Sequence, residues 1–551
     1  MRIRFRFSAA LLCVGLAFPL TSSLSGGEGP RTRAEISGYT ATSRYADVMN
    51  FIQDLQRLSP RVRLETIAVS AEGRPIPMMV IGDPVPSSPL DLGGEGRLPI
   101  YFQANIHAGE VEGKEAALML ARHLALAEDP GFLEGLVILI APIFNPDGNE
   151  KISPENRTRQ NGPAEGVGVR ANGQGLDLNR DGMKLESPEV RGLVSRVLRR
   201  WDPALVLDSH THNGSYHEEV VTYVGSLNPN GDGSLLRYFY ERLTPELNRI
   251  MRETHGIICI PHGDFMSIRE PEKGWRPLGP QPRYISNYIG LRNRIGILNE
   301  NYPYADFRTR VEGAYRLFLG VSEYCFSHRE EIRRLLREAD RRTVRRGLSP
   351  AGDETFAVRF DVRPLKNPVT IHGYEMEAVS GPGGRTRARK TDRKRTYTMP
   401  FFADYFARRS VSLPVGYLIE KPIPEVTGKL LEHGVVVERL TAPVTLEVEA
   451  FTVTDVRAGA RPNQGHRLNT VEGEYQTLTR EFPVGSIWVG LAQPLANLAS
   501  SLLEPESDDG LLVWNFFDRY LFGQWSRAPQ VYPVYRVRRP VAFARETVRS
   551  P

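Results

Sequence analysis

Three apolar segments of this chain each end in ionisable side chains, and this repetition constrains the fold more than any other feature. The segment "RLPIYFQAN" is followed by His107 and Glu110, "PALVLDSHTH" contains His210 and His212, and "RIGILNE" ends in Glu300. Short apolar runs bounded by turn residues are typical of buried strands. Because ligands of open α/β sheets bind at the carboxyl ends of strands, we expect these side chains to meet at one edge of a sheet.

The residue types at these strand ends indicate a metal site. An imidazole and a carboxylate on one turn can hold a zinc ion if the chain supplies a third ligand. Both His210 and His212 qualify, since alternate residues of an extended strand lie on the same side. A lone histidine near an apolar run is more often structural, but ionisable groups past three strand ends favour a metal.

Helical spacing between these strands predicts an α/β fold. Residues 43–58, "EGKEAALMLARHLALA" and "LLRYFYERLTPELNRIMRE" have the spacing of helices, and one long charged helix is predicted over about 308–345. Strands that alternate with helices imply a mixed, mostly parallel sheet with helices on both faces. We assign this α/β domain to residues 40–345.

The texture changes after residue 350. Short alternating strands such as "TFAVRFDVRP" and "VTLEVEAFTVTDVRA" predict a β-rich accessory domain over residues 350–551, with one short helix near "PLANLASSLLEP". The basic run at 385–395 is expected to be a solvated loop. The aromatic cluster of Trp514, Phe516 and Phe517 is expected to be core rather than a sugar-binding surface.

The first 27 residues have the form of a secretory signal peptide. Arg2, Arg4 and Arg6 precede a short apolar core and then small residues, so we expect an exported, periplasmic or secreted protein. Without those arginines the net charge of +5 becomes smaller, and nothing indicates nucleic acid or stable membrane insertion after signal removal. Cys259 and Cys325 would then be the cysteines of the mature chain, either bridged or as two buried thiols.

Five sequence elements, in order, resemble the zinc carboxypeptidases, the carboxypeptidase A-like metallopeptidases. They are "HAGE", "NPDG", "LDLNRD", "DSHTHNGS" and "ILNE", and the resemblance covers about residues 40–345. It implies one zinc ion held by His107, Glu110 and His210, because the family pattern has the third histidine directly after an apolar strand and a serine. It also implies that Asp177 orients His107; the alternative for Asp177 is a turn residue.

The resemblance implies that Glu300 is the general base. A carboxylate beside a zinc-activated water can take its proton and pass it to the leaving amine. The alternative for Glu300 is a structural partner for Arg308 or Arg310.

Asn179 and Arg180 resemble the pair that grips the terminal carboxylate of a substrate. A guanidinium matches a carboxylate with two parallel hydrogen bonds, although a structural ion pair is the alternative. Asp181 departs from the family pattern, which has Asn or a bulky residue there. Because of this departure, the details of the family's substrate pocket and its preference for a free C-terminus do not carry over directly to this chain.

Two further roles in the family pattern have two candidates each. The arginine that stabilises the developing oxyanion would be Arg157, with Arg159 as the second choice. The tyrosine that closes over the substrate would be Tyr288, with Tyr284 second, and a packing role is the alternative for both.

The sequence therefore predicts an exported zinc metallocarboxypeptidase that acts on peptides or peptide-like substrates with a free carboxylate. A zinc amidase or deacylase, or a peptidoglycan stem-peptide peptidase, would keep the same fold and metal. A catalytically silent binding protein is the rival from another class. The retention of His107, Glu110, His210 and Glu300 together speaks against it.

Overall fold

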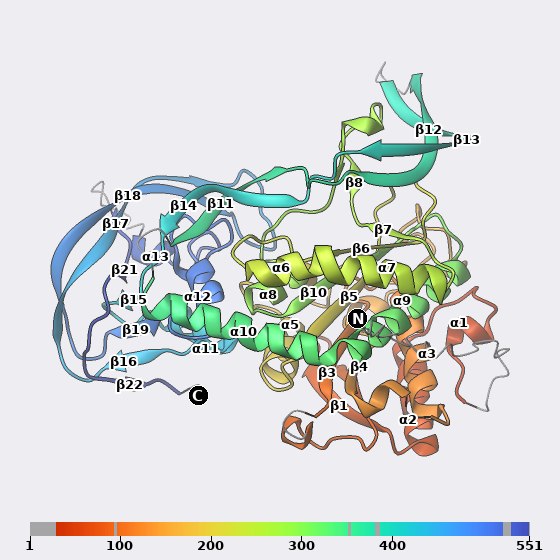
Figure 1. Cartoon of the computed structure of the whole chain (residues 1–551), viewed down its shortest axis with the longest axis horizontal. Coiled ribbons are helices and arrows are strands. Elements are labelled where there is room, and N and C mark those ends of the chain that lie inside the picture. Colours follow the sequence, from red (N-terminus) through yellow and green to blue (C-terminus); the bar gives the residue numbers. More distant parts are fainter. Residues whose placement is uncertain are drawn as a thin grey trace, which may run out of the picture.

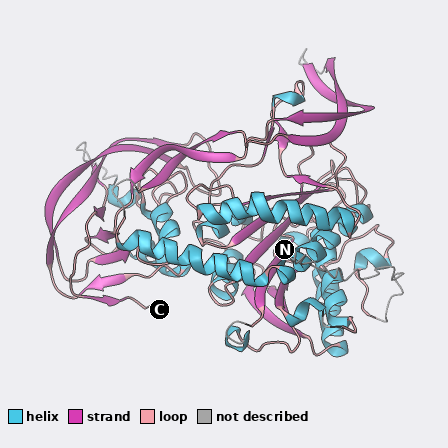
Figure 2. Ribbon diagram, viewed as in Figure 1, coloured by secondary structure: helices cyan, strands magenta, loops and turns pink. Residues whose placement is uncertain are grey.

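The computed structural model describes residues 29–92, 96–129, 131–350, 354–380, 386–521 and 530–549. The predicted signal peptide, residues 1–27, lies outside this range. A mixed α/β region is followed by a β-rich region, and the two lie side by side (Figure 1 and Figure 2). Within the described residues, no helix is long and apolar enough to cross a membrane.

An eight-stranded mixed sheet forms the centre of the first region, in the order β1-β2-β4-β3-β5-β10-β6-β7. The central strands β4, β3, β5 and β10 are parallel to one another, and antiparallel pairs join β1, β2 and β6 to them. The strands are β1 (Val62–Val69), β2 (Pro75–Ile81), β3 (Leu98–Ala104), β4 (Leu136–Ala141), β5 (Leu205–Thr211), β6 (Val221–Gly225), β7 (Cys259–Pro261) and β10 (Ile295–Asn301). The predicted mixed sheet is confirmed.

Both faces of this sheet are buried. Along β3, Ile100 and Phe102 pack into one core cluster, whereas Tyr101 between them packs into another, as the two-residue period of a strand requires. The first cluster includes side chains of α2, α3, α7 and α9. The helices of the described residues are α1 (Arg33–Ile36), α2 (Tyr45–Leu58), α3 (Glu112–Leu126), α4 (Pro146–Asn149), α5 (Pro188–Gly192), α6 (Gly233–Tyr238), α7 (Thr244–Glu253), α8 (Ile285–Leu291), α9 (Phe307–Ser327), α10 (Arg329–Leu348), α11 (Pro424–His433), α12 (Ala496–Leu503) and α13 (Asp518–Leu521).

The other face of the sheet is covered in part by the C-terminal region. One core cluster contains Tyr101 of β3 and Ile289 of α8 together with Leu430 of α11, Leu498 of α12 and Trp514. A hydrophobic core shared in this way buries apolar surface of both regions at once. The C-terminal region is therefore packed onto the eight-stranded sheet, while the boundary near residue 350 stays a prediction.

The C-terminal region consists mainly of antiparallel strands. One sheet has the order β18-β17-β21-β15-β19-β16-β22, with β20 paired to β17, and β11–β14 and β12–β13 form two further pairs. Its strands are β11 (Thr355–Arg363), β12 (Val369–Ser380), β13 (Thr386–Met399), β14 (Asp404–Ser412), β15 (Gly416–Ile419), β16 (Glu438–Leu440), β17 (Val444–Ala458), β18 (Asn469–Phe482), β19 (Ile487–Gly490), β20 (Gln530–Val531), β21 (Val534–Val537) and β22 (Arg545–Thr547). Trp514 and Phe517 are fully buried, as predicted, and Phe516 is half-buried and packs against the same core.

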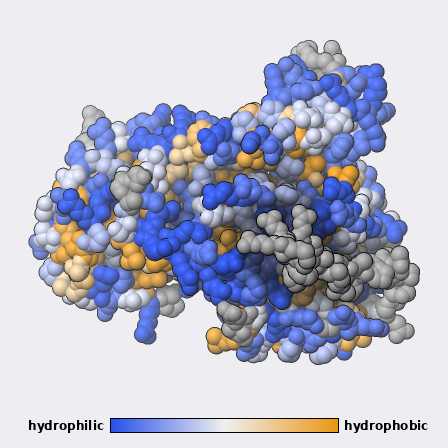
Figure 3. All heavy atoms as spheres, viewed as in Figure 1, coloured by the Kyte–Doolittle hydropathy of each residue, from blue (hydrophilic) through white to orange (hydrophobic). Residues whose placement is uncertain are grey.

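Three local predictions were wrong. The long charged helix is two helices, because His328 between α9 and α10 has a non-helical backbone and its ring stacks on Tyr324; Figure 3 shows hydrophilic side chains over α10. The C-terminal region has α11 and α13 besides the predicted α12, and α11 carries the usual signals of Pro at its start and Gly434 after its end. The basic run enters β13, where pairing with β12 satisfies its backbone.

The two cysteines of the described residues are free and buried. The structure therefore has two thiols and not a bridge between Cys259 and Cys325.

His433 at the end of α11 is fully buried where the two regions meet. Its Nδ1 accepts a hydrogen bond from the Tyr288 hydroxyl at 2.8 Å, and its Nε2 donates to the Met183 carbonyl at 3.0 Å. A neutral ring satisfies both contacts, and burial lowers the pKa of His433 to about 3.

We expect this ring to make the protein less stable in acid. Below the ordinary histidine pKa of 6.5 the unfolded chain binds a proton that folded His433 excludes, so the free energy of unfolding falls as the pH falls. Between about pH 6.5 and pH 4, the free energy of unfolding of the wild type should fall by roughly 3 kcal/mol more than that of the His433→Gln variant. Urea unfolding of both proteins across that range measures the difference, and parallel curves would contradict the expectation.

Candidate functional site

His107, Glu110 and His210 form a compact cluster at the carboxyl ends of β3 and β5. One ligand atom from each residue lies within 4.8 Å of the other two. Glu110 Oε2 is 3.1 Å from His107 Nδ1 and 2.9 Å from His210 Nδ1, and the two Nδ1 atoms are 3.1 Å apart. All three residues are buried. The structure thus brings together the three residues that the sequence singled out as metal ligands.

The turn after β3 has a backbone that suits this arrangement. Asn105 has a φ of +64°, a conformation that asparagine adopts more readily than most residues, and its side-chain amide donates to the Glu110 carbonyl. A Cβ at Gly109 would lie 2.8 Å from the carbonyl oxygen of Gly168. Only glycine therefore fits between His107 and Glu110 at this position.

Each imidazole bonds to a carboxylate through Nε2, the ring nitrogen that faces away from the cluster. His107 Nε2 lies 3.0 Å from Asp177 Oδ1, and His210 Nε2 lies 2.8 Å from Asp208 Oδ2. Because ionised carboxylates only accept hydrogen bonds, each Nε2 is the donor and each Nδ1 is directed at the cluster. Gln103 in turn donates to the other oxygen of Asp208 at 3.1 Å.

The sequence reasoning missed Asp208. It lies two residues before His210 on β5 and so on the same face of the strand. That alternation, together with the usual need of a ligand histidine for an outer acceptor, was a signal that could have identified it.

The donor set fits a zinc ion. Two imidazole nitrogens and one carboxylate oxygen are ligands that zinc prefers, and three protein ligands leave one position open. Burial alone would lower the pKa of His210, but the charges of Asp208 and Glu110 raise it well above its ordinary value. In the metal-free protein a proton therefore occupies this cluster, and a metal ion would displace it.

Glu110 remains ionised in the cluster. Burial alone would raise its pKa, but the positive charges of His107 and Arg157 and the hydrogen bonds from the two rings hold it well below the usual range. The carboxylate is therefore available as a ligand at neutral pH.

Glu300 lies beside this cluster on β10. The parallel pairing of β10 with β5 sets Glu300 opposite His210, so both side chains leave the sheet on the same face. Burial raises the pKa of Glu300 to about 8; His210 opposes this shift and the charge of Glu110 adds to it. A carboxyl group with such a pKa is suited to exchange protons near neutral pH.

The alternative of a structural pair for Glu300 has no support in the contacts. Arg308 bonds to Glu312, and Arg310 donates to backbone carbonyls, among them those of Asn161 and Gly162.

Two arginines flank the cluster, and one of them was missed. Arg157 donates to Gln160, to Glu110 at 2.9 Å and to a backbone carbonyl. Arg170, which the sequence reasoning did not consider, donates from Nε to Asp177 at 2.8 Å and has one terminal nitrogen 3.6 Å from Glu110. Arg159 instead bonds to the Tyr304 hydroxyl and is exposed. A cation in the loop that leads to Asp177 was the available signal for Arg170.

Asn179 and Arg180 follow Asp177 directly. Asn179 is buried; its side-chain oxygen accepts from the backbone of Ile285, and its amide nitrogen lies 3.5 Å from His210 Nε2. The Arg180 guanidinium lies over the ring of Tyr284, 4.5 Å from its centroid, and remains partly exposed.

Asp181, the departure from the family pattern, has a structural role. Its carboxylate is fully buried and accepts hydrogen bonds from Lys184, from the backbone of Glu186 and from Ser187. Asp181 therefore fixes the backbone of the loop after Arg180.

Tyr288 does not occupy the place expected for a tyrosine that closes over a substrate. It is fully buried on α8, and its hydroxyl bonds to His433 and Arg292. Packing of α8 against α11 explains this position, and it favours the packing role that was the alternative for Tyr288. Tyr284, the second candidate, is half-buried beside Arg180.

His212 lies apart from the metal cluster. Its Nε2 donates to the Gly263 carbonyl at 2.8 Å, and its Nδ1 accepts from the backbone of Gly214 at 2.7 Å. Both nitrogens therefore hold the backbone. His212 packs near His217 and His262, which are also buried.

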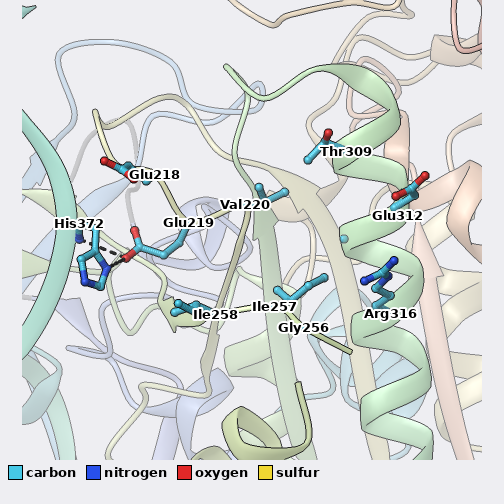
Figure 4. Close-up of a pocket in the computed structure, with 11 residues that line it drawn as sticks. Glu218, Glu219, Val220, Gly256, Ile257, Ile258, Thr309, Glu312, Arg316 and His372 are labelled. Carbon is cyan, nitrogen blue, oxygen red and sulfur yellow. Dashed lines mark hydrogen bonds and ion pairs between the residues drawn. The ribbon is translucent and has the colours of Figure 1, made fainter. Parts of the chain in front are cut away.

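A cavity of about 530 Å³ lies elsewhere, between the start of β6, α9 and β12. Figure 4 shows Glu219 and His372 on one side of it and Glu312 and Arg316 of α9 on the other. Glu219 and His372 bond to each other at 2.5 Å. None of the metal-cluster residues lines this cavity, so it is separate from the candidate site.

The chain is similar in sequence to known carboxypeptidases. Residues 48–197 match the model of the family described as zinc carboxypeptidase. Carboxypeptidase 2 of Trichophyton rubrum is 23% identical over 471 residues, which are 82% of this chain and 80% of that protein. Carboxypeptidase D of Mus musculus is 29% identical over 177 residues, which cover 28% of this chain and 13% of that protein.

A metallo-carboxypeptidase structure from Burkholderia cenocepacia is similar with a TM-score of 0.38 and 16% identity. The match covers 51% of this chain and 68% of that one.

We expect His210 and His212 to differ in their effect on metal content. The His210→Gln variant should lose zinc because it removes a ligand, whereas His212→Gln should retain the zinc content of the wild type. Metal analysis after dialysis against limiting zinc, with thermal unfolding to verify folding, measures this. Zinc loss in folded His212→Gln alone would reverse the assignment.

Proposed function

We propose that this chain is a zinc metallopeptidase of the carboxypeptidase family, whose model residues 48–197 match, and that it removes residues from the free C-termini of peptides. The observation that carries the proposal is the half-buried Glu300 beside the cluster of His107, Glu110 and His210. Arg180 in the adjoining loop supplies a cation for the terminal carboxylate. One zinc ion per chain would serve the reaction.

Glu300 would act as general base and then as general acid. When bound, zinc would polarise the scissile carbonyl and acidify a water molecule. Glu300 would take the proton of the attacking water and deliver it to the departing amine nitrogen. Asp177 and Asp208 would keep both histidine rings in the tautomer that directs Nδ1 at the ion.

Arg170 is a better candidate than Arg157 to stabilise the negative charge on the carbonyl oxygen. The guanidinium of Arg157 donates from all three nitrogens to protein acceptors, which are Gln160, Glu110 and the Thr211 carbonyl. Arg170 binds Asp177 through Nε, and its side chain is 40% exposed. One terminal nitrogen lies 3.6 Å from Glu110, beyond hydrogen-bond distance, so the terminal nitrogens could still donate to a substrate oxygen. Arg157 would then hold Glu110 in place.

Arg180 would bind the terminal carboxylate of the substrate. One terminal nitrogen of Arg180 donates to the Asn179 carbonyl, and the guanidinium stacks on the ring of Tyr284. This arrangement leaves further donors for a carboxylate, which a guanidinium recognises with parallel hydrogen bonds. Tyr284 takes the place of Tyr288 as the tyrosine beside the substrate.

The start of the chain supports a site of action outside the cytoplasm. Its basic residues, short apolar core and small residues are those of a secretory signal. We therefore propose a periplasmic or secreted enzyme.

We expect Glu300→Gln to abolish turnover without loss of zinc. The amide cannot accept the proton of the attacking water, and removal of such a base typically costs about 10²–10⁴-fold in rate. Mass spectrometry of peptides with free C-termini, beside the same peptides amidated, measures release of single C-terminal residues. A zinc chelator should stop the wild type.

Equal cleavage of amidated peptides, or an active Glu300→Gln variant, would contradict this proposal. Cleavage of N-acylated amino acids or peptidoglycan fragments, with no release from ordinary peptides, would identify the rival substrates instead.

Substitutions of Arg170 and Arg157 should have different effects on the kinetics and on zinc binding. Arg170→Ala should lower kcat about 10²–10³-fold with little change in KM, because its donors act on charge that develops only in the transition state. Arg157→Ala should mainly weaken zinc binding, since Glu110 loses its cation, and exposed Arg159→Ala serves as the control. A larger kcat effect at Arg157 than at Arg170 would restore Arg157 to the role given it by the resemblance.

A further inference from the structure

The turn between β17 and β18 has an unusual residue at its tip. Asn463 and His466 exchange two backbone hydrogen bonds of 2.7 and 3.0 Å, which leaves Gln464 and Gly465 as the central residues of a two-residue turn. Their φ angles of +52° and +83° correspond to a type I′ turn. Such turns prefer Asn-Gly, and a glutamine with positive φ is strained. Strain of this kind persists where the side chain has another task.

The side chain of Gln464 reaches the metal site. Its Oε1 accepts a hydrogen bond from the backbone N–H of Asp177 at 2.7 Å, across 287 residues of sequence. Within the described residues, the backbone N–H of Asp177 donates to no other acceptor. The carboxylate of the same Asp177 holds His107 and binds Arg170. Gln464 of the C-terminal region is therefore linked to the metal ligand His107 through a single residue, Asp177.

A second contact fixes the same turn to the other end of the loop. His466 Nε2 lies 2.8 Å from Glu186 Oε1, and its Nδ1 lies 3.2 Å from Asn515 Oδ1. The imidazole also packs edge-on against Trp514, which is buried in the shared core. The turn is thus anchored on its own region while it holds Glu186.

These two contacts bracket the segment 177–186, which carries Asn179 and Arg180. We propose that the β17–β18 turn is part of the active site and that Gln464 is a positioning residue, which holds the Asp177 backbone so that its carboxylate meets His107. The inference rests on the proposed function of the metal site. It makes the C-terminal region a structural component of catalysis and not an appendage.

The test compares two substitutions of equal length. Gln464→Met removes the acceptor, whereas Gln464→Glu keeps an oxygen at the same reach, and both leave the same backbone strain. Loss of an outer partner of a metal ligand typically costs about 10–100-fold in affinity, and Gln464 acts one step further out. We therefore expect zinc binding about 3–10-fold weaker in Gln464→Met and near wild type in Gln464→Glu, measured by competition with a chelator.

Hydrogen–deuterium exchange of the metal-free protein supplies a readout independent of zinc and of turnover. The amide of Asp177 should exchange faster in Gln464→Met than in the wild type or Gln464→Glu. Arg467→Ala, an exposed change on the same hairpin, should alter neither exchange at Asp177 nor zinc binding. Unchanged exchange and zinc affinity in Gln464→Met would overturn the inference.

A third substitution separates positioning from stability. Asparagine suits the strained position better than glutamine, but its side chain is one methylene shorter. Gln464→Asn should keep the thermal midpoint of the wild type or raise it, and still lose zinc affinity and kcat. If zinc affinity and kcat instead follow thermal stability across the four variants, the role of Gln464 is only structural.

Failure of the inference about Gln464 can be distinguished from failure of the proposed function. A wild type that binds zinc but releases no C-terminal residue would refute the proposed reaction, while exchange and zinc affinity would still report on Gln464. An active wild type with an unaffected Gln464→Met variant would refute only this inference.

Discussion

The parallel pairing of β5 with β3 and β10 is the constraint on which the site depends. It sets Ala104 opposite Ser209 and Glu300 opposite His210, so the ends of three strands come to one edge of the sheet. The turn that carries His107 and Glu110 begins directly after β3. A shift of one residue in either pairing would turn a functional side chain to the other face. The long apolar strands, buried on both faces, fix this register.

The same geometry gathers several charges in a buried place, and the neighbouring loops compensate them. Asp177 and Asp208 each accept a hydrogen bond from a ligand histidine. Asn145 of the "NPDG" element donates to the carbonyls of Ile106 and Arg170, which ties the turn after β3 to the loop that leads to Asp177. Buried polar groups without such partners would be costly. The polar network thus accounts for sequence elements that touch no metal.

The C-terminal region affects both the stability and the geometry of this site. Its helices α11 and α12 share a core with the catalytic sheet, and the contact of α11 with α8 draws Tyr288 into the interior. Its β17–β18 turn meets the loop that begins at Asp177 and ends near Glu186. The loop that carries Asn179 and Arg180 is therefore held from two sides, one from each region.

The sequence by itself determined the mixed α/β class, the β-rich second part and the group of His107, Glu110, His210 and Glu300, because strand ends and short-range spacing are local properties. Only the tertiary structure decided which residues support that group. Arg170 and Asp208 are recognised by what they touch, and Gln464 comes from a turn 287 residues away. The alternation along β5 was a local signal for Asp208, but local periodicity contains no information on a contact such as that of Gln464, which arises when separate elements pack together.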